Sequence, residues 1–150
     1  MDLEIRAAKP SDVDALLALQ EGVHQFCWER QAWLKELDRP QSLVWIVDDG
    51  ASSEPVGYLV AWRVVDAIEL VDLSVAPEMR GQQIASAMVQ TLIALAGANS
   101  VARIALEVRS ENRGAINFYK KLGFHFVGRQ RGYYEDGECA RLMQRWIHMS

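Results

Sequence analysis

The stretch "EMRGQQIASAMVQ", residues 78–90, follows the apolar run "AIELVDLSVAP" of residues 67–77. The run predicts a buried strand that Pro77 ends, and Ile84 and Met88 then recur on one face of a predicted helix. A helix N-terminus offers unpaired backbone N–H groups and a positive dipole end, so this turn can hold a phosphate. An ordinary strand-to-helix connection is the alternative, and the rest of the chain decides between the two.

Length, composition and charge limit the class of protein. The chain has 150 residues and a net charge of −4, which fit one domain over residues 1–150 and argue against a general nucleic-acid binder. No apolar run approaches the ~18 residues of a membrane span, and the first ten residues lack the pattern of a signal peptide. Cys27, Cys139 and the histidines show no metal-ligand spacing. We therefore expect free thiols, no metal and a cytoplasmic protein.

Hydrophobic periodicity predicts the order β-α-α-β-β-β-α-β-α-β-β, which is typical of a single α/β domain with parallel and antiparallel pairs. The expected strands span residues 3–8, 42–47, 56–65, 67–77, 101–108, 124–130 and 139–148. The expected helices span residues 9–22 and 26–37, the opening stretch to about residue 97, and residues 112–123. Glycine at position 97 is expected just past the end of the third helix.

Two residues are candidates for acid–base chemistry. Glu107 alternates with the apolar Leu106 and Val108 of its strand. It is either a carboxylate at the solvent end of an edge strand or a general base whose pKa partial burial raises. Tyr119 adjoins the buried face of its helix next to Ile116. It is either a tyrosine at the edge of the core or a general acid, because a phenol with a pKa near ~10 stays protonated at neutral pH.

Aromatic residues supply further candidates. Tyr133 and Tyr134 lie in a polar loop between the last two predicted strands, where they either contact a ligand or partner or pack the hairpin. Trp28 and Trp33, in the predicted helix over residues 26–37, are interpreted as core residues rather than as part of a ligand site.

These segments together resemble the GNAT acetyltransferases, and within them the RimI type, which acetylates the N-terminus of a ribosomal protein. "LSVAPEMRGQQIASAMV" is similar to the acetyl-CoA segment of that family, and "LEVRSENRGAINFYKKLGF" to its second signature. "RGYYEDGECARLM" and "HQFCWE" resemble the closing segment of the RimI type and the segment between its first two helices. The likeness covers nearly the whole chain.

The resemblance implies a single GNAT domain with a mixed, mostly antiparallel sheet of about seven strands and about four flanking helices. It implies that acetyl-CoA is the donor, that Glu107 is the base and that Tyr119 is the acid. The residues implied at the cofactor are Leu73, Val75, Arg80, Gly81, Gln82, Gln83, Ile84, Ala85, Ser86, Asn112 and Tyr119. The residues expected at the acceptor are Phe26, Asp72, Tyr133 and Tyr134.

One residue departs from the family pattern, because Gln83 stands where the family has glycine. We expect its backbone to be helical, so that the N–H donors remain while the side chain crowds the diphosphate. The expected reaction is direct acetyl transfer to a protein N-terminal α-amine, with a ribosomal protein as the expected partner. The expected protein binds neither nucleic acid nor membrane and is a monomer or weak homodimer. The alternatives are acetylation of a lysine side chain or small-molecule amine, and a non-catalytic acyl-CoA-binding module.

Overall fold

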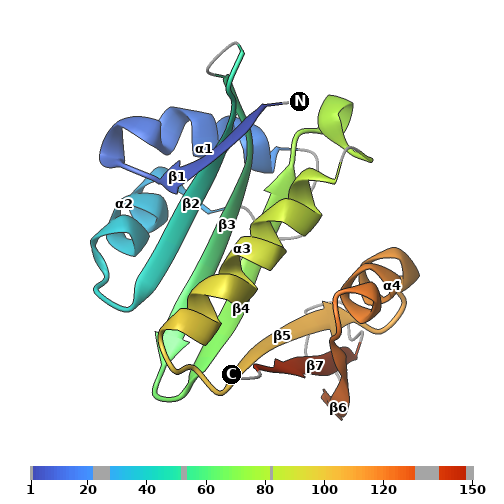
Figure 1. The fold of residues 1–150 in the computed structure, drawn as a ribbon. Coiled ribbons are helices and arrows are strands. Elements are labelled where there is room, and N and C mark those ends of the chain that lie inside the picture. The colour runs from blue at the N-terminus through green and yellow to red at the C-terminus, as the bar shows by residue number, and fades with distance from the viewer. Residues whose placement is uncertain (1, 22–27, 52–53, 82, 131–138, 148–150) are drawn as a thin grey trace. The chain divides into compact units, whose positions relative to one another are not determined.

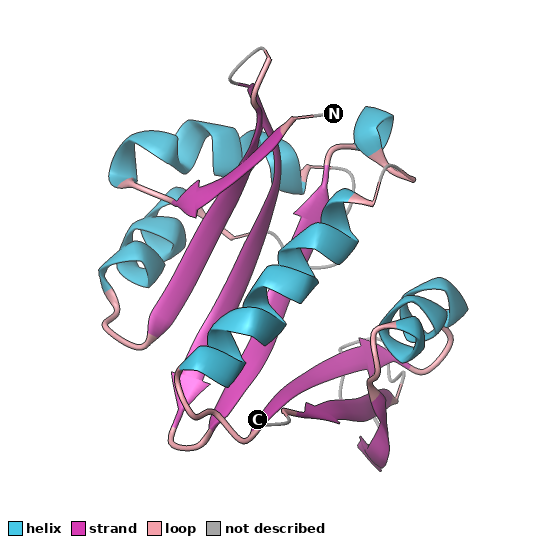
Figure 2. Cartoon of the chain, in the orientation of Figure 1, coloured by secondary structure: helices cyan, strands magenta, loops and turns pink. Residues whose placement is uncertain are grey.

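The order of elements predicted from the sequence is confirmed. The structure is a computed structural model that describes residues 2–21, 28–51, 54–81, 83–130 and 139–147. The strands are β1 (Leu3–Ala7), β2 (Ser42–Asp49), β3 (Glu54–Val64), β4 (Ala67–Val75), β5 (Arg103–Arg109), β6 (His125–Gln130) and β7 (Ala140–Trp146) (Figure 2). The helices are α1 (Val13–Gln20), α2 (Arg30–Asp38), α3 (Ile84–Ala98) and α4 (Arg113–Lys121), with 3-10 turns η1 (Pro10–Asp12) and η2 (Pro77–Met79).

The seven strands form one sheet in the order β1-β2-β3-β4-β5-β7-β6. β1 with β2, β2 with β3, β5 with β7 and β6 with β7 are antiparallel, whereas β4 and β5 are parallel. The predicted mixed and mostly antiparallel sheet is therefore confirmed. A parallel pair needs a crossover connection, and α3 supplies it between β4 and β5.

The chain divides into two compact units, and the first contains residues 1–63 and 72–89. Here α2 packs against α1 and against β2, as the blue and cyan ribbons in Figure 1 show. Buried residues of β2 and β3 supply the core, together with Leu16 of α1 and Trp33 of α2, both fully buried. β3 is buried on both faces, because the residues from Val56 to Ala61 are all buried. Gly57 of β3 lies so close to β4 that a Cβ there would come within 2.8 Å of the carbonyl oxygen of Ser74.

An ion-pair cluster joins β1 to η1 and β2 in the first unit. Arg6 donates to both carboxylate oxygens of Asp12 at 2.8 and 2.9 Å and to Asp48 at 2.7 Å. The hydrogen bond from Arg6 is the main reason that the pKa of Asp12 lies below its usual value. The two carboxylates likewise raise the pKa of Arg6. The cluster therefore favours the charged forms and stabilises the folded chain at neutral pH.

The second unit contains residues 64–71 and 90–150. Four residues at the start of β4 pair with β5, β5 pairs with β7, and β7 pairs with β6. Buried Ile104, Leu106 and Val108 alternate along β5, and Ile116 is the buried residue of α4. Gly123, with φ at +95°, ends the connection from α4 to β6, a conformation that glycine adopts without strain.

Several boundaries differ from those predicted. α3 continues to Ala98, so Gly97 lies within the helix, and Ser100 with φ at +58° is the left-handed residue after it. A helical glycine costs only about 1 kcal/mol relative to alanine, and the apolar face of α3 outweighs that cost. Trp28 precedes α2 and is not in a helix, because α2 begins at Arg30.

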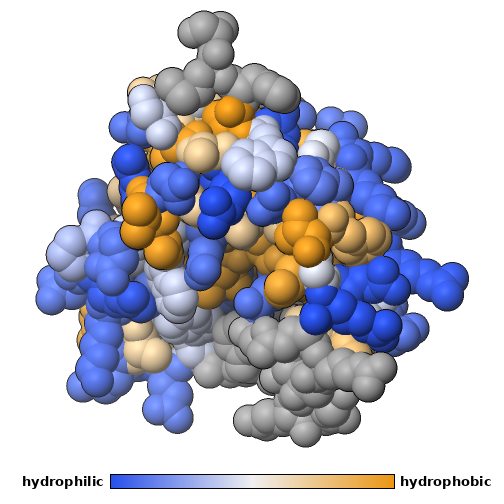
Figure 3. All heavy atoms as spheres, turned by 90° about the horizontal axis from the view of Figure 1, so that it is seen from below, coloured by the Kyte–Doolittle hydropathy of each residue, from blue (hydrophilic) through white to orange (hydrophobic). Residues whose placement is uncertain are grey.

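The surface is mostly polar, and Figure 3 shows one face on which hydrophobic residues form small groups among hydrophilic ones. Exposed large hydrophobic residues among those described are Leu34, Val64, Val65, Phe126, Val127 and Trp146. Within the described part of the chain, no helix is long and apolar enough to cross a membrane.

Candidate active site

The connection from β4 to α3 contains two residues in the left-handed region. Gly81 has φ at +82° and Gln83 has φ at +66°, and Arg80 before them is extended. The expectation that Gln83 is helical is therefore wrong. Glycine, which stands at this position in the family pattern, adopts such a backbone without strain. Gln83 holds the same conformation at the cost of strain.

The first turn of α3 offers backbone donors. The carbonyl oxygen of Gln83 accepts a hydrogen bond from the N–H of Ala87 at 3.0 Å, so the helix begins directly after Gln83. The N–H groups of Ile84, Ala85 and Ser86 then have no acceptor within the helix. Ala85 and Ser86 are small and partly exposed, so an anion can approach these donors. A diphosphate fits this donor set, because each N–H points out of the helix end where the dipole is positive.

The end of β4 lies outside the ladder with β5. The paired register covers only Ala67–Leu70 and Arg103–Leu106. Leu73 and Val75 of β4 lie beyond it, with Leu73 partly exposed and Val75 buried. Their backbone groups are therefore not engaged by β5. A strand edge of this kind can take a further extended chain as a partner through main-chain hydrogen bonds.

Glu107 lies on the solvent side of β5. Its neighbours Leu106 and Val108 are buried and point the other way, and Glu107 is exposed opposite Leu142 of β7. The predicted alternation is confirmed, whereas the predicted partial burial is wrong. A role for Glu107 as a base thus rests on accessibility, because water can reach its carboxylate.

α4 carries two further candidates. The side chain of Asn112 accepts a hydrogen bond from the N–H of Ala115 at 3.1 Å, which confirms it as the N-cap. Tyr119 is partly buried, and its ring makes edge contacts with Phe118 and Phe124 at centroid distances of 5.0 and 5.5 Å. The ring is therefore fixed by packing while part of the residue remains accessible.

Asp72 of β4 is buried and accepts hydrogen bonds from two aromatic side chains. Its Oδ2 atom accepts hydrogen bonds from the hydroxyl of Tyr58 at 2.8 Å and from the indole N–H of Trp28 at 3.0 Å. Sequence reasoning missed both partners, which lie 14 and 44 residues away along the chain. An acidic residue in an otherwise apolar strand is the one signal in the sequence that points to such a network.

Four predicted residues lie outside the described part of the chain: Phe26, Gln82, Tyr133 and Tyr134. The other predicted residues are described, and they are divided between the two units. Leu73, Val75 and the described residues from Arg80 to Ser86 lie on one strand, turn and helix of the first unit. Glu107, Asn112 and Tyr119 lie on β5 and α4 of the second.

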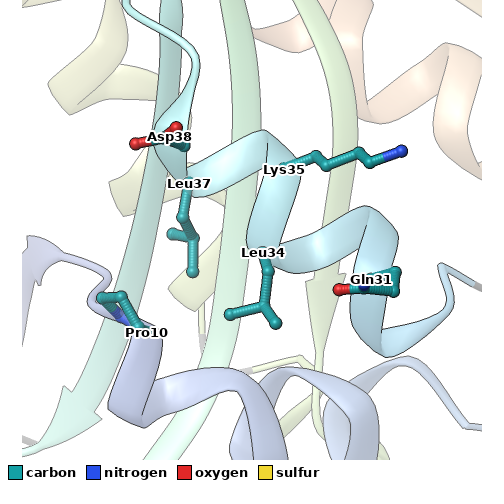
Figure 4. A pocket seen from close by; sticks show the side chains of 6 residues that line it. All are labelled: Pro10, Gln31, Leu34, Lys35, Leu37 and Asp38. Carbon is teal, nitrogen blue, oxygen red and sulfur yellow. The ribbon is translucent and has the colours of Figure 1, made fainter.

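A groove between η1 and α2 contains none of these residues. Pro10, Leu34 and Leu37 face one another across it, whereas Lys35 points away (Figure 4). Gln31 and Asp38 complete its lining. Among the described residues, no group of three or more His, Cys, Asp or Glu side chains is placed to hold a metal ion.

Comparison with known proteins decides the family. The sequence pattern of the acetyltransferase (GNAT) family matches residues 13–124. The chain belongs to this family. The predicted GNAT membership is therefore confirmed, and the chain is an N-acetyltransferase of GNAT type.

Named relatives of this GNAT chain act on proteins. It is 27% identical over 146 residues to the putative [ribosomal protein bS18]-alanine N-acetyltransferase of Bacillus subtilis, covering 95% of this chain and 93% of that one. It is 29% identical to the peptidyl-lysine N-acetyltransferase YjaB of Salmonella typhimurium, covering 86% and 88%. Among solved structures, the ribosomal-protein-S18-alanine N-acetyltransferase of Escherichia coli matches with a TM-score of 0.89 and 26% identity over 99% of this chain and 96% of that one. The predicted RimI-like GNAT fold is thus confirmed.

Proposed function

We propose that this GNAT enzyme transfers the acetyl group of acetyl-CoA to the α-amine of a protein N-terminus, with a ribosomal protein as the acceptor. The observation that carries the proposal is the connection from β4 to α3. Among its described residues, Gly81 and Gln83 are left-handed, and the N–H groups of Ile84, Ala85 and Ser86 have no acceptor within the helix. The similarity to two alanine N-acetyltransferases of ribosomal protein S18 supports the acceptor. A reducing cytoplasm, where ribosomal proteins are made, is the corresponding location.

The cofactor fits the turn and the adjoining strand. The N–H groups of Ile84, Ala85 and Ser86 would hold the diphosphate of acetyl-CoA, with Arg80 and Gly81 at the same turn. The backbone of Leu73 and Val75 would pair with the pantetheine arm. Backbone N–H groups of β4 around Leu73 to Val75 would stabilise the negative charge that develops on the thioester oxygen during attack. Asn112 would contact the cofactor from the start of α4.

The chemical step is direct attack of the amine on the thioester. Only a neutral amine attacks, and an α-amine with a pKa near ~8 is about one tenth neutral at pH 7, whereas a lysine near ~10.4 is neutral at only a few parts in ten thousand. An α-amine therefore needs only a modest base. Exposed Glu107 can take the proton through a water molecule, and Tyr119 can donate a proton to the departing thiolate.

A lysine or small-molecule acceptor is the second candidate. The similarity to a peptidyl-lysine acetyltransferase favours it, at an identity close to that of the α-amine relatives. A lysine acceptor would require more from the base, because more of the amine is protonated. A non-catalytic acyl-CoA-binding module is the third candidate, and the presence of both Glu107 and Tyr119 argues against it.

A pair of matched peptides separates these functions. One peptide carries a free N-terminal alanine and no lysine, and the other has a blocked N-terminus and one lysine. Both are incubated with acetyl-CoA and the chain, and the products are located by mass spectrometry. We expect one acetyl group on the alanine peptide and none on the lysine peptide. The reverse result would establish the lysine alternative. Acetyl-CoA binding without product on either peptide would exclude both peptide acceptors and leave a small-molecule amine or the binding module.

A further inference from the structure

Asp72 is a buried carboxylate in β4, directly before Leu73. It is 7% exposed, and its Oδ2 atom takes hydrogen bonds from both Tyr58, which is fully buried, and Trp28. A buried carboxylate is destabilising unless hydrogen bonds replace its hydration. Hydrogen bonds to an ionised acceptor are about twice as strong as those between neutral groups. Asp72 therefore holds both aromatic side chains firmly against β4.

Trp28 is fixed although it lies in neither a helix nor a strand. The side chain of Gln20 accepts from the backbone N–H of Trp28 at 3.0 Å and donates to its carbonyl oxygen at 2.7 Å. The Trp28 ring stacks on Trp33 at a centroid distance of 5.0 Å, and Trp33 also donates to Gln20. Together with the hydrogen bond from its indole N–H to Asp72, these contacts hold both the backbone and the side chain of Trp28 in place, although the residue lies in irregular structure.

We propose that Asp72 is a positioning residue for the acceptor side of the active site. It fixes the indole of Trp28 beside β4, one residue before Leu73, and so shapes the surface that an incoming peptide meets. This inference rests on the proposed function, which puts the thioester along Leu73 and Val75. Trp28 as a residue is partly exposed. Donor binding at the main-chain N–H groups of α3 is not expected to depend on this network, because Asp72, Trp28 and Tyr58 lie outside α3.

A second carboxylate and indole pair in the first unit provides a matched control. The indole N–H of Trp62 donates to Glu36, which is 3% exposed and also accepts from the hydroxyl of Ser42. This pair has the same chemistry as Asp72 and Trp28, but it joins α2 to β2 and β3, away from Leu73. If the role of Asp72 is purely structural, the two pairs will respond alike to substitution.

The kinetic test compares Asp72→Asn, Trp28→Phe and Tyr58→Phe with the controls Glu36→Gln and Trp62→Phe. The KM for the acceptor peptide is expected to rise about tenfold in the first two variants, the effect of one lost hydrogen bond to a charged group, with the KM for acetyl-CoA unchanged. The double variant of Asp72 and Trp28 is expected to resemble the single ones, because both remove the same contact. The controls are expected to lower the unfolding temperature and leave the acceptor KM unchanged.

Two kinetic results would overturn the inference. An acceptor KM that rises in Asp72→Asn but not in Trp28→Phe would mean that Asp72 contacts the substrate amine directly. An equal rise in Glu36→Gln and Trp62→Phe would mean that any loss of packing produces the effect.

A spectroscopic readout separates this inference from the proposed function. The chain has five tryptophans, and the indole N–H signal of Trp28 is identified by its loss in Trp28→Phe. We expect this proton to exchange slowly with water in the unaltered chain and faster in Asp72→Asn, while the Trp62 proton is unaffected. An unchanged Trp28 exchange rate would overturn the inference, whereas an unaltered chain that acetylates no α-amine would overturn the proposed function.

Discussion

Gln83→Gly tests the strain in the turn before α3. An L-residue in the left-handed region costs roughly 1–2 kcal/mol, and Gln83 with φ at +66° bears that cost. Glycine removes this strain, but its greater conformational freedom in the unfolded chain lowers the free energy of unfolding by about 0.5–1 kcal/mol. The net expectation is a gain of about 0.5–1 kcal/mol in the free energy of unfolding. For a chain of this length, a gain of about 1 kcal/mol raises the unfolding temperature by about 2–4 °C.

Gly81→Ala is the opposite change in the same turn. Gly81 has φ at +82°, and a Cβ there would meet no atom within 4 Å, so any loss comes from the backbone conformation alone. We expect Gly81→Ala to lower the free energy of unfolding by about 1–2 kcal/mol. Gly114→Ala in α4 is the control, because its Cβ would make only an ordinary contact at 3.9 Å and alanine favours a helix by up to about 1 kcal/mol.

Thermal and urea unfolding of the three variants measures these changes in the free energy of unfolding. We expect Gln83→Gly and Gly114→Ala to be more stable than the unaltered chain and Gly81→Ala to be less stable. We also expect Gln83→Gly to bind acetyl-CoA at least as tightly as the unaltered chain, because the N–H donors are unchanged and a side chain has been removed. A destabilised Gln83→Gly, together with a neutral Gly81→Ala, would refute the left-handed turn.

Three further substitutions test other parts of the account. Glu107→Gln is expected to lower the rate about 10²–10⁴-fold and flatten the acid limb of the pH–rate profile, with stability unchanged because the residue is exposed; an unaltered profile would exclude it as the base. Tyr119→Phe keeps the ring contacts with its neighbours and is expected to lower turnover, so equal turnover would remove it from the acid role. Asp12→Asn is expected to cost about 1–3 kcal/mol at pH 7 by breaking the bonds from Arg6. The folded pKa of Asp12 is lowered, so this difference should shrink in urea titrations as the pH falls below the ordinary aspartate value near ~4 and through the lower folded pKa, and a constant difference would contradict it.

The sequence predicted the element order because its local signals agree. Alternation along β5 placed Glu107 opposite Leu106 and Val108, and Asn112 read correctly as an N-cap. Each of these depends on neighbours a few residues away. The exposure of Glu107 was not predictable in the same way, because burial depends on what covers a face of the sheet.

Other features depend on the path of the backbone or on distant residues. Gln83 was expected to be helical, since its residue type permits it, but its φ is positive in the structure. Trp28 was placed in the predicted helix over residues 26–37, and its contact with Asp72 could not be anticipated across 44 residues. Gln20, which binds the backbone of Trp28, carries no signal in the sequence.

The most direct test of the account is a titration of the labelled chain followed through its backbone amide signals. Acetyl-CoA is predicted to shift the amides of Ile84, Ala85 and Ser86 strongly, because their N–H groups would hold its diphosphate. Acetyl-pantetheine, which lacks the diphosphate, is predicted to leave these three amides in place. Acetyl-CoA that supports acetyl transfer without moving them would contradict the account.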